Sequence, residues 1–265
     1  AMRASILIVA LLAAVAFAAP FADVAVRGKV TSNEPRVNSL KGLTKEKLAK
    51  LFKSKLGGSA TECKICIDFM NEAVQYLIEV IANGGVIGGC QGLCAAALKN
   101  RSQILDVVCD LLCTVVGIEE FEKLLSDADP DPVWLCEEVK ACDYSDSDSA
   151  NITSLSVSPQ KGHPGTKFTF DISYDLISFT GIGSVGVVVF GPGAAADGGS
   201  LLMYPQPGTY SGQFQLSTKP DQYNTWAPGP YEFQIAVCEG DCGCTHDHNK
   251  VLTMQSLNFT ITARN

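Results

Sequence analysis

The chain has 265 residues, which predicts one or two domains, and its 11 cysteines predict an oxidising compartment or a metal. The formal net charge of −8 is uneven, because residues 1–55 carry ten basic and three acidic side chains, whereas residues 56–265 carry ten and 25. An acidic body of this kind argues against a nucleic-acid partner.

The N-terminus has the composition of a secretory signal peptide over residues 1–18. Arg3 precedes an apolar run from Ile6 to Ala19, and Ala16-Phe17-Ala18 offers a cleavage site. The run holds roughly 15 apolar residues, fewer than the ~20 that span a bilayer. We therefore expect a protein that is secreted or that lies in the lumen of an acidic secretory-endocytic compartment. Glycosylation is expected at three sequons, Asn100, Asn151 and Asn258.

Residues 19–58 form an N-terminal segment with a Lys-rich amphipathic helix. Thr44 suits the N-cap and Gly57 the stop, and the apolar side chains between them fall at helical spacing: Leu48, Leu51, Phe52 and Leu56. Such a helix could contact an anionic lipid surface. The alternatives are a solvated helix docked on the acidic domain that follows, or a propeptide.

Residues 59–143 hold eight cysteines on predicted helices. They form four close pairs: Cys63 and Cys66, Cys90 and Cys94, Cys109 and Cys113, Cys136 and Cys142. Eight cysteines allow about 105 pairings, but positions i and i+4 share one helix face. In an antiparallel helical hairpin, the residue numbers of facing positions add up to the same total for every pair. Cys94 with Cys109 and Cys90 with Cys113 share one total, which predicts two stacked disulfides. The outer cysteines then close the ends as Cys63–Cys142 and Cys66–Cys136.

The first helix of this domain, roughly residues 62–82, has more apolar surface than one core requires. Its apolar arc is roughly 220° wide, about twice the usual width. One stripe can pack inside the domain, and the second consists of Ile65, Phe69, Tyr76 and Val80. The second stripe needs another partner: lipid, a second protomer or the neighbouring domain. The alternative is a fully buried helix in a small disulfide-rich bundle.

This domain resembles the saposin B-type family. The resemblance rests on the ECKIC opening, the DPVWLCEEVKAC closing and the helices between them, over about 80 residues. A second central cysteine pair, where the family usually has one bridge, departs from the pattern. Members of the family bind or perturb lipids, often as dimers, which implies a lipid or membrane surface and a homodimer here. Because residues 62–142 carry 14 acidic and five basic side chains, we expect membrane affinity to rise as pH falls.

Residues 144–150 are predicted as an acidic, Ser-rich linker, without the Gly and distal Glu of a calcium-binding loop. From Asn151 the pattern changes to period two, and seven short strands are predicted over residues 151–265. The PGPYEFQIAVC strand resembles one of an immunoglobulin-like domain, although the paired Cys and central Trp of antibody domains are missing. We therefore predict a multidomain chain, in which an all-α, disulfide-stapled domain precedes an all-β immunoglobulin-like sandwich.

Candidate chemistry lies in the C-terminal half. Gly181-Ile-Gly183-Ser-Val-Gly186 matches a dinucleotide-binding string, but it precedes a strand and opens no helix, so we interpret it as a turn. A second cluster contains Cys238, Cys242, Cys244, His246 and His248. Its residues could bind zinc, but a local disulfide with one odd thiol, available to an intermolecular bridge, is favoured. No histidine lies in a nucleophile setting, so we predict no enzyme, no cofactor and no metal.

The order of the segments resembles the countin family, secreted factors of social amoebae that act in a multi-subunit complex setting group size. Two functions are therefore expected. The first is a secreted, non-enzymatic protein that binds or perturbs lipid. The second is a countin-like extracellular signalling subunit that regulates group size and adhesion. A third interpretation makes the helical domain structural and the sandwich a binder of carbohydrate or protein.

Overall fold

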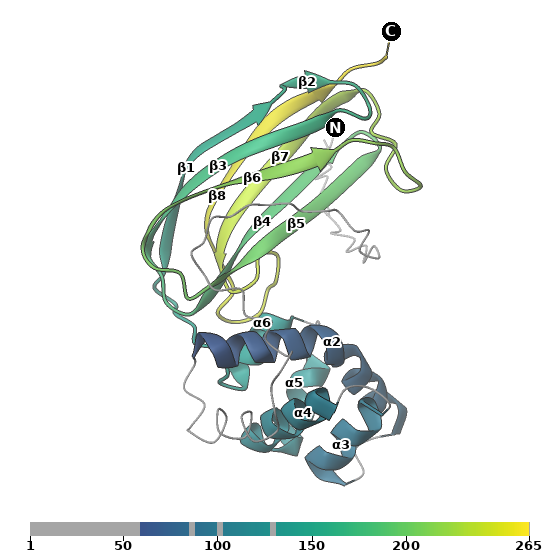
Figure 1. Cartoon of the computed structure of the whole chain (residues 1–265), viewed down its shortest axis with the longest axis vertical. Coiled ribbons are helices and arrows are strands. Elements are labelled where there is room, and N and C mark those ends of the chain that lie inside the picture. The colour runs from purple at the N-terminus through teal and green to yellow at the C-terminus, as the bar shows by residue number, and fades with distance from the viewer. Residues whose placement is uncertain (1–58, 85–87, 100–102, 128–130, 265) are drawn as a thin grey trace, which may run out of the picture.

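The computed structural model describes residues 59–84, 88–99, 103–127 and 131–264. The predicted signal peptide and Lys-rich helix, together with Asn100, lie outside these residues. The described chain forms a disulfide-bonded helical domain and a domain of two β-sheets, stacked end to end (Figure 1). The predicted succession of an all-α and an all-β part is confirmed.

Four disulfides connect the helices of the first domain. The described helices are α2 (Ala60–Gly84), α3 (Gly89–Ala97), α4 (Gln103–Val116), α5 (Ile118–Asp127) and α6 (Pro132–Glu138). Cys63–Cys142 and Cys66–Cys136 join α2 to α6 and the residues after it, and Cys90–Cys113 and Cys94–Cys109 join α3 to α4. None of these described helices is long and apolar enough to cross a membrane.

Local sequence explains where α2 begins and where α4 ends. Ser59 and Glu62 form a capping box, in which each side chain accepts a hydrogen bond from the backbone N–H of the other residue, at 3.3 and 3.4 Å. Gly117 has a φ of +88° between α4 and α5, a conformation that glycine adopts at little cost. In Figure 1, α2 and α6 lie directly beneath the sheets.

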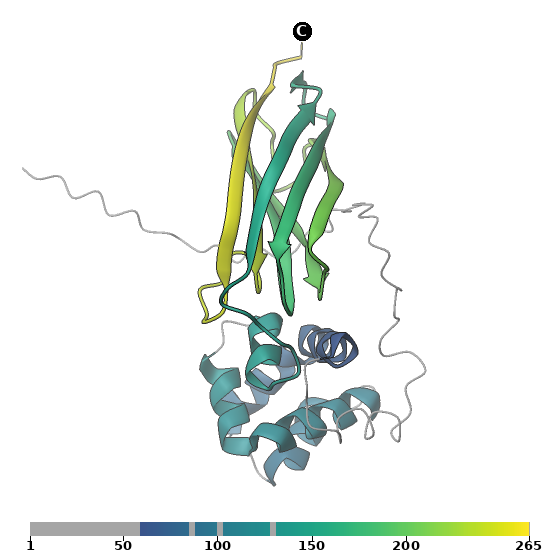
Figure 2. The same ribbon diagram turned by 90° about the vertical axis from the view of Figure 1, so that its left-hand side faces the viewer.

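The second domain consists of two sheets that pack face to face (Figure 2). The described strands are β1 (Ser149–Ser158), β2 (Lys161–Gly162), β3 (Lys167–Ser178), β4 (Ile182–Gly191), β5 (Ala194–Met203), β6 (Gly208–Ser217), β7 (Gly229–Glu239) and β8 (Lys250–Ile261). One sheet has the order β1-β3-β6 and the other β2-β8-β7-β4-β5. The seven predicted runs lie in the long strands. The strand β2 was not predicted, because an alternation of apolar and polar residues cannot be recognised in two residues.

Aromatic side chains from both sheets fill the sandwich core. Phe170 of β3 stacks on Phe233 of β7, with ring centroids 4.0 Å apart, and both rings are fully buried. At the start of β7, the hydroxyl of Tyr231 has the carbonyl oxygens of Pro192 and Ala227 as acceptors. A buried tyrosine that bonds upstream backbone in this way resembles the tyrosine corner of immunoglobulin-like sandwiches. The immunoglobulin-like identity itself stays a prediction.

Candidate functional site: the domain junction

The two domains meet where α6 faces the loop between β7 and β8. The Oδ1 of Asp131 caps α6 by accepting hydrogen bonds from the backbone N–H groups of Val133 at 2.9 Å and Trp134 at 3.2 Å. Pro132 follows at the first helical position, and both residue types are preferred where they stand. The Oδ2 of Asp131 accepts a hydrogen bond from Nδ2 of Asn249 at 2.9 Å. One buried carboxylate thus starts the helix and joins it to the sandwich.

A disulfide and an asparagine shape the β7–β8 loop. Cys238–Cys242 closes the first turn of the loop. The backbone N–H of Asp241 donates to Oδ1 of Asn249 at 2.9 Å. Asn249 therefore bonds its own loop through Oδ1 and the helical domain through Nδ2.

Two aromatic stacks lie across the junction. The ring of Trp134 stacks on that of His246 with centroids 4.4 Å apart, and Tyr144 stacks on His248 at 3.5 Å. The Nδ1 of His248 lies 3.0 Å from Oδ1 of Asp146. These contacts hold both imidazoles against α6 and the linker. Because two of the neighbouring cysteines form a disulfide, the residues of the zinc alternative do not converge on one point.

The linker packs against the ends of the sheets. The backbone N–H of Asp143 donates to the hydroxyl of Tyr204 at 2.9 Å, and that of Ser145 donates to Oε1 of Glu239 at 2.8 Å. Gly181, with a φ of +84°, permits the close approach, because a Cβ there would overlap the carbonyl oxygen of Asp143. The linker is therefore a packed part of the junction.

Two carboxyl groups, Glu137 of α6 and Glu239 of β7, are completely buried. Neither oxygen of Glu137, nor Oε2 of Glu239, has a hydrogen-bond partner among the described residues. Burial, followed by the charges of Asp131 and Glu239, raises the pKa of Glu137 to about 9. Burial, followed by the charge of Asp148, raises the pKa of Glu239 to about 7. Both groups are consequently protonated at mildly acidic pH.

An apolar layer also joins the domains. The core of the helical domain includes Ile182 of β4, and Met203 and Tyr204 at the end of β5 pack against it. A fully buried side chain of this size contributes about 1.5–3 kcal/mol relative to an exposed one. The junction is therefore continuous with the core of the helical domain.

The second stripe of α2 is mostly covered. Ile65 and Phe69 are 1% and 0% exposed and belong to the same core as Ile182. The lipid-facing expectation requires them to face solvent, and they do not, because α2 packs against α3, α4, α5 and α6. Tyr76 and Val80, the other two residues of the stripe, are half-buried. For Ile65 and Phe69 the structure therefore agrees with the alternative, a helix buried in a small disulfide-rich bundle.

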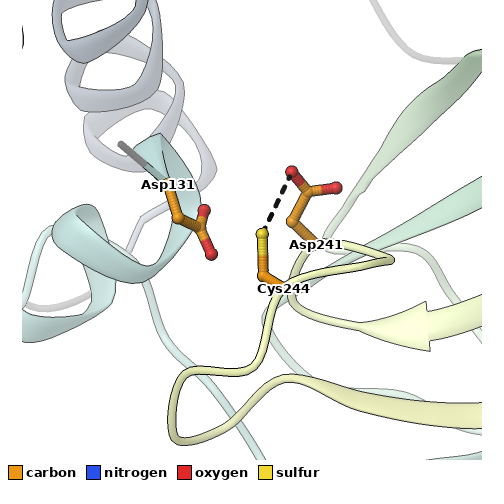
Figure 3. A group of neighbouring side chains, drawn as sticks. All are labelled: Asp131, Asp241 and Cys244. Carbon is orange, nitrogen blue, oxygen red and sulfur yellow. Dashed lines mark hydrogen bonds between the residues drawn. The ribbon is translucent and has the colours of Figure 1, made fainter. Parts of the chain in front are cut away.

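Asp131, Asp241 and Cys244 bring three potential ligand atoms within 4.8 Å of one another (Figure 3). The Sγ of Cys244 lies 4.0 Å from Oδ2 of Asp241, and Cys244 takes part in none of the disulfides of the described residues. Carboxylates and a thiolate are a ligand set that zinc accepts. Both oxygens of Asp131, however, already accept hydrogen bonds from α6 and Asn249. Those bonds account for its position without a cation.

The remaining predicted sites lie on strands. Asn151 of β1 and Asn258 of β8 are exposed, so both sequons are accessible to glycosylation. The glycine string from Gly181 to Gly186 runs from a turn into β4. The residues that sequence reasoning missed are Glu137, Glu239 and Asn249. A signal existed for Glu137 alone, because it follows Cys136, whose disulfide with α2 buries that turn of α6.

Both domains match one family. Residues 56–140 match the countin N-terminal domain and residues 150–265 match the countin C-terminal domain. Countin-1 of Dictyostelium discoideum is 37% identical over 213 residues, which cover 80% of this chain and 82% of that protein. The chain belongs to the countin family.

Two more countins of Dictyostelium discoideum show similar agreement. Countin-3 is 37% identical over 80% of this chain and 94% of its own length, and Countin-2 is 36% identical over 82% and 84%. Among solved structures, the alkylpurine DNA glycosylase AlkC of Pseudomonas fluorescens matches with a TM-score of 0.38 and 15% identity, over 65% of this chain and 53% of that one. That similarity is too low to inform the fold or the function of a countin. The whole-chain resemblance is confirmed, and the saposin B-type likeness stays a resemblance.

Proposed function

We propose that this countin-family chain is a secreted, non-enzymatic signalling protein that regulates the size of cell groups as a subunit of an extracellular complex. The observation that carries the proposal is the match to both countin domains in order, with 37% identity to Countin-1 over 80% of the chain. Because the match includes both sides of the junction, the active unit is the two-domain protein.

The outer face of the five-stranded sheet offers a surface for protein partners. Its large apolar side chains are 40–60% exposed: Val188, Phe190, Leu201, Val251 and Met254. The strand register shows that Met254 and Val188 share one face of the sheet. Met254 pairs with Ala236 and Ala236 with Gly186, and Gly186 is two positions before Val188 on β4. We call these five residues the apolar sheet face. Gln234 and Glu232 lie beside Val188 and Phe190 and bond each other, so the face combines exposed apolar side chains with polar ones, as protein interaction sites do.

The outer face of the three-stranded sheet is different. Its polar side chains bond one another, as between Gln213 and Asp171 and between Thr209 and Asp175, both at 2.6 Å. A polar face of this kind is stable in water. The contrast supports the apolar sheet face as the side through which the chain joins a complex.

Two variants test this proposal in a group-size assay. Wild-type protein added to starving Dictyostelium discoideum cells is expected to change the number of cells per group and to elute from conditioned medium well above its own 28.1 kDa. The Met254→Lys protein should elute at the size of the single chain and should no longer change the number of cells per group. Ile177→Lys is the matched control, because Ile177 is 64% exposed on the other sheet. Wild-type protein that elutes alone and leaves group size unchanged would refute the proposal.

A lipid surface is a second proposed partner. Tyr76 and Val80 keep part of their surface, and Val115 of α4 is 47% exposed. Co-sedimentation with anionic and neutral liposomes at pH 7 and pH 5 tests it. Binding that strengthens at pH 5 would support lipid contact by the acidic helical domain. Protein that stays in the supernatant at both pH values would remove lipid as a partner.

A further inference from the structure

We propose that Glu137 and Glu239 form a proton-operated latch between the domains. The sandwich docks on the helical domain while both carboxyl groups are neutral, and it separates when they ionise. Separation uncovers the apolar layer around Ile182, Met203 and Tyr204. The latch is a property of the chain itself and holds whether or not the chain signals.

The two carboxyl groups lie on the elements that meet at the junction, Glu137 on α6 and Glu239 at the end of β7, where it accepts a hydrogen bond from Ser145 of the linker. Residues three or four apart lie on the same side of a helix, so Glu137 and Glu138 both lie on the side of α6 that carries Trp134, and of the two only Glu137 is fully buried. That side carries the stack on His246 and the hydrogen bond to Asn249. Glu137 is fully buried and close enough to Glu239 for its charge to raise the pKa of Glu137. The two groups therefore approach from opposite domains.

The charged and titratable groups around the latch are mostly acidic. On the helical side and the linker they are Glu62, Asp131, Glu138, Lys140, Asp143, Tyr144, Asp146 and Asp148. On the sandwich they are Tyr204, Asp241, His246, His248 and Lys250. Lys140 and Lys250 oppose the acids, but each is the weakest of the influences on its neighbouring glutamate. His248 is engaged by Asp146 at 3.0 Å. No ion pair to Glu137 or Glu239 occurs in the part of the chain that the structure describes.

A buried carboxylate without a partner is unstable, because the protein interior does not replace the water that solvated it. Two responses are available: the group stays protonated, or the interface opens and water returns. In the open state each glutamate titrates near its ordinary pKa of 4.5, whereas in the closed state the pKa is about 9 for Glu137 and about 7 for Glu239. Closure is therefore fully favoured below about pH 4.5 and weakens as pH rises toward 7 and then 9.

Glu137 is the principal element of the latch. The Oε1 of Glu239 accepts a hydrogen bond from the backbone N–H of Ser145, which stabilises its ionised form in part. Neither oxygen of Glu137 has such a donor among the described residues. Neutralising Glu137 permanently should therefore have the larger effect.

A single tryptophan can report the opening. Trp134 lies in the junction, and the other tryptophan, Trp226, is 3% exposed in the sandwich. In a Trp226→Phe background, emission comes from Trp134 alone. Between pH 5 and pH 9 we expect a red shift of this emission and, by small-angle X-ray scattering, a longer maximum dimension. If Trp226→Phe disturbs the sandwich, the wild-type protein is measured instead, and the emission of Trp226 is treated as a constant background.

Glu137→Gln and Glu138→Gln form the matched pair. Both remove one carboxyl from α6, but Glu138 is half-buried whereas Glu137 is fully buried. Glu137→Gln should move the transition upward by at least about one pH unit, as expected when the group with the larger pKa shift is removed, and Glu138→Gln should leave it in place. His246 and His248 are present in both variants, so any difference between the two transitions comes from the glutamate that was replaced. If Glu137→Gln fails to fold, Glu239→Gln replaces it.

Two outcomes would overturn the latch. The first is a protein whose emission and maximum dimension stay constant from pH 5 to pH 9. The second is an equal displacement of the transition by Glu137→Gln and Glu138→Gln, which would assign the effect to net charge. Neither outcome bears on the group-size assay, which is performed at one pH.

Discussion

The Nδ2 of Asn249 donates a hydrogen bond to the Oδ2 of Asp131, which lies 118 positions earlier in the chain and in the other domain. The Oδ1 of the same amide accepts from the backbone N–H of Asp241 at 2.9 Å. Asn249 thus uses both ends of one side chain, and Asp131 is the only group on the helical side that it bonds among the described residues. The pair holds the β7–β8 loop against α6.

Asn249→Ala is expected to loosen the junction and to lower the free energy of unfolding by about 1–2 kcal/mol, because two hydrogen bonds are lost and a buried carboxylate oxygen loses its donor. Urea denaturation measures the loss, and Trp134 emission locates it. Asn224→Ala is the control, since Asn224 accepts a bond from the backbone N–H of Ala195 within the sandwich. It should lower stability without changing Trp134. A shift of Trp134 emission in both variants would disprove the assignment.

Gly181→Ala should destabilise the protein more than Gly243→Ala. Both glycines have positive φ, +84° and +94°, so each substitution carries a similar backbone cost of about 1–2 kcal/mol. A Cβ at Gly181 also overlaps the carbonyl of Asp143, whereas a Cβ at Gly243 meets nothing within 4 Å. The difference between the two variants in urea denaturation measures the packing of the linker. Equal losses of unfolding free energy in the two variants would show that the linker moves away from the added Cβ at no cost.

Tyr231→Phe should lower the free energy of unfolding by about 0.5–1.5 kcal/mol, because it removes the part-buried hydrogen bonds from the hydroxyl to the carbonyl oxygens of Pro192 and Ala227. Tyr210→Phe is the matched change, since the hydroxyl of Tyr210 donates to the carbonyl of Gln206 at an exposed position. It should cost under about 0.5 kcal/mol, the usual range for surface substitutions. The comparison fails if the two variants unfold at the same urea concentration.

The urea midpoint of the wild type is expected to fall as pH rises from 5 to 9. Glu137 and Glu239 have raised pKa values of about 9 and about 7 in the folded protein, so folding takes up protons and is favoured at low pH. Each carboxyl contributes at most about 1.4 kcal/mol per pH unit between its unfolded and folded pKa. Glu137→Gln should flatten the dependence, and Glu138→Gln should not. A midpoint that rises over this range would contradict the sign.

Local patterns predict much of the fold and little of the junction. The disulfides of the helical domain follow the equal residue-number totals of the pairs among Cys90, Cys94, Cys109 and Cys113, because a helical hairpin fixes which positions face each other. The wide apolar arc of α2 indicates a second contact, but periodicity does not identify what covers Ile65 and Phe69. Asn249 has no local signal, since its partner Asp131 lies 118 positions away in the other domain.

The packing of Ile182 into the core of the helical domain has a consequence for recombination between countins. The face of α6 and the loop at residues 240–249 fit one another residue by residue, through Asp131 with Asn249 and Trp134 with His246. A chimera that takes its helical half from one parent and its sandwich from another keeps these two contacts only where the parents carry matching residues. Countins should therefore tolerate exchange of α3 to α5, or of the distal strand ends, more readily than a crossover at the linker.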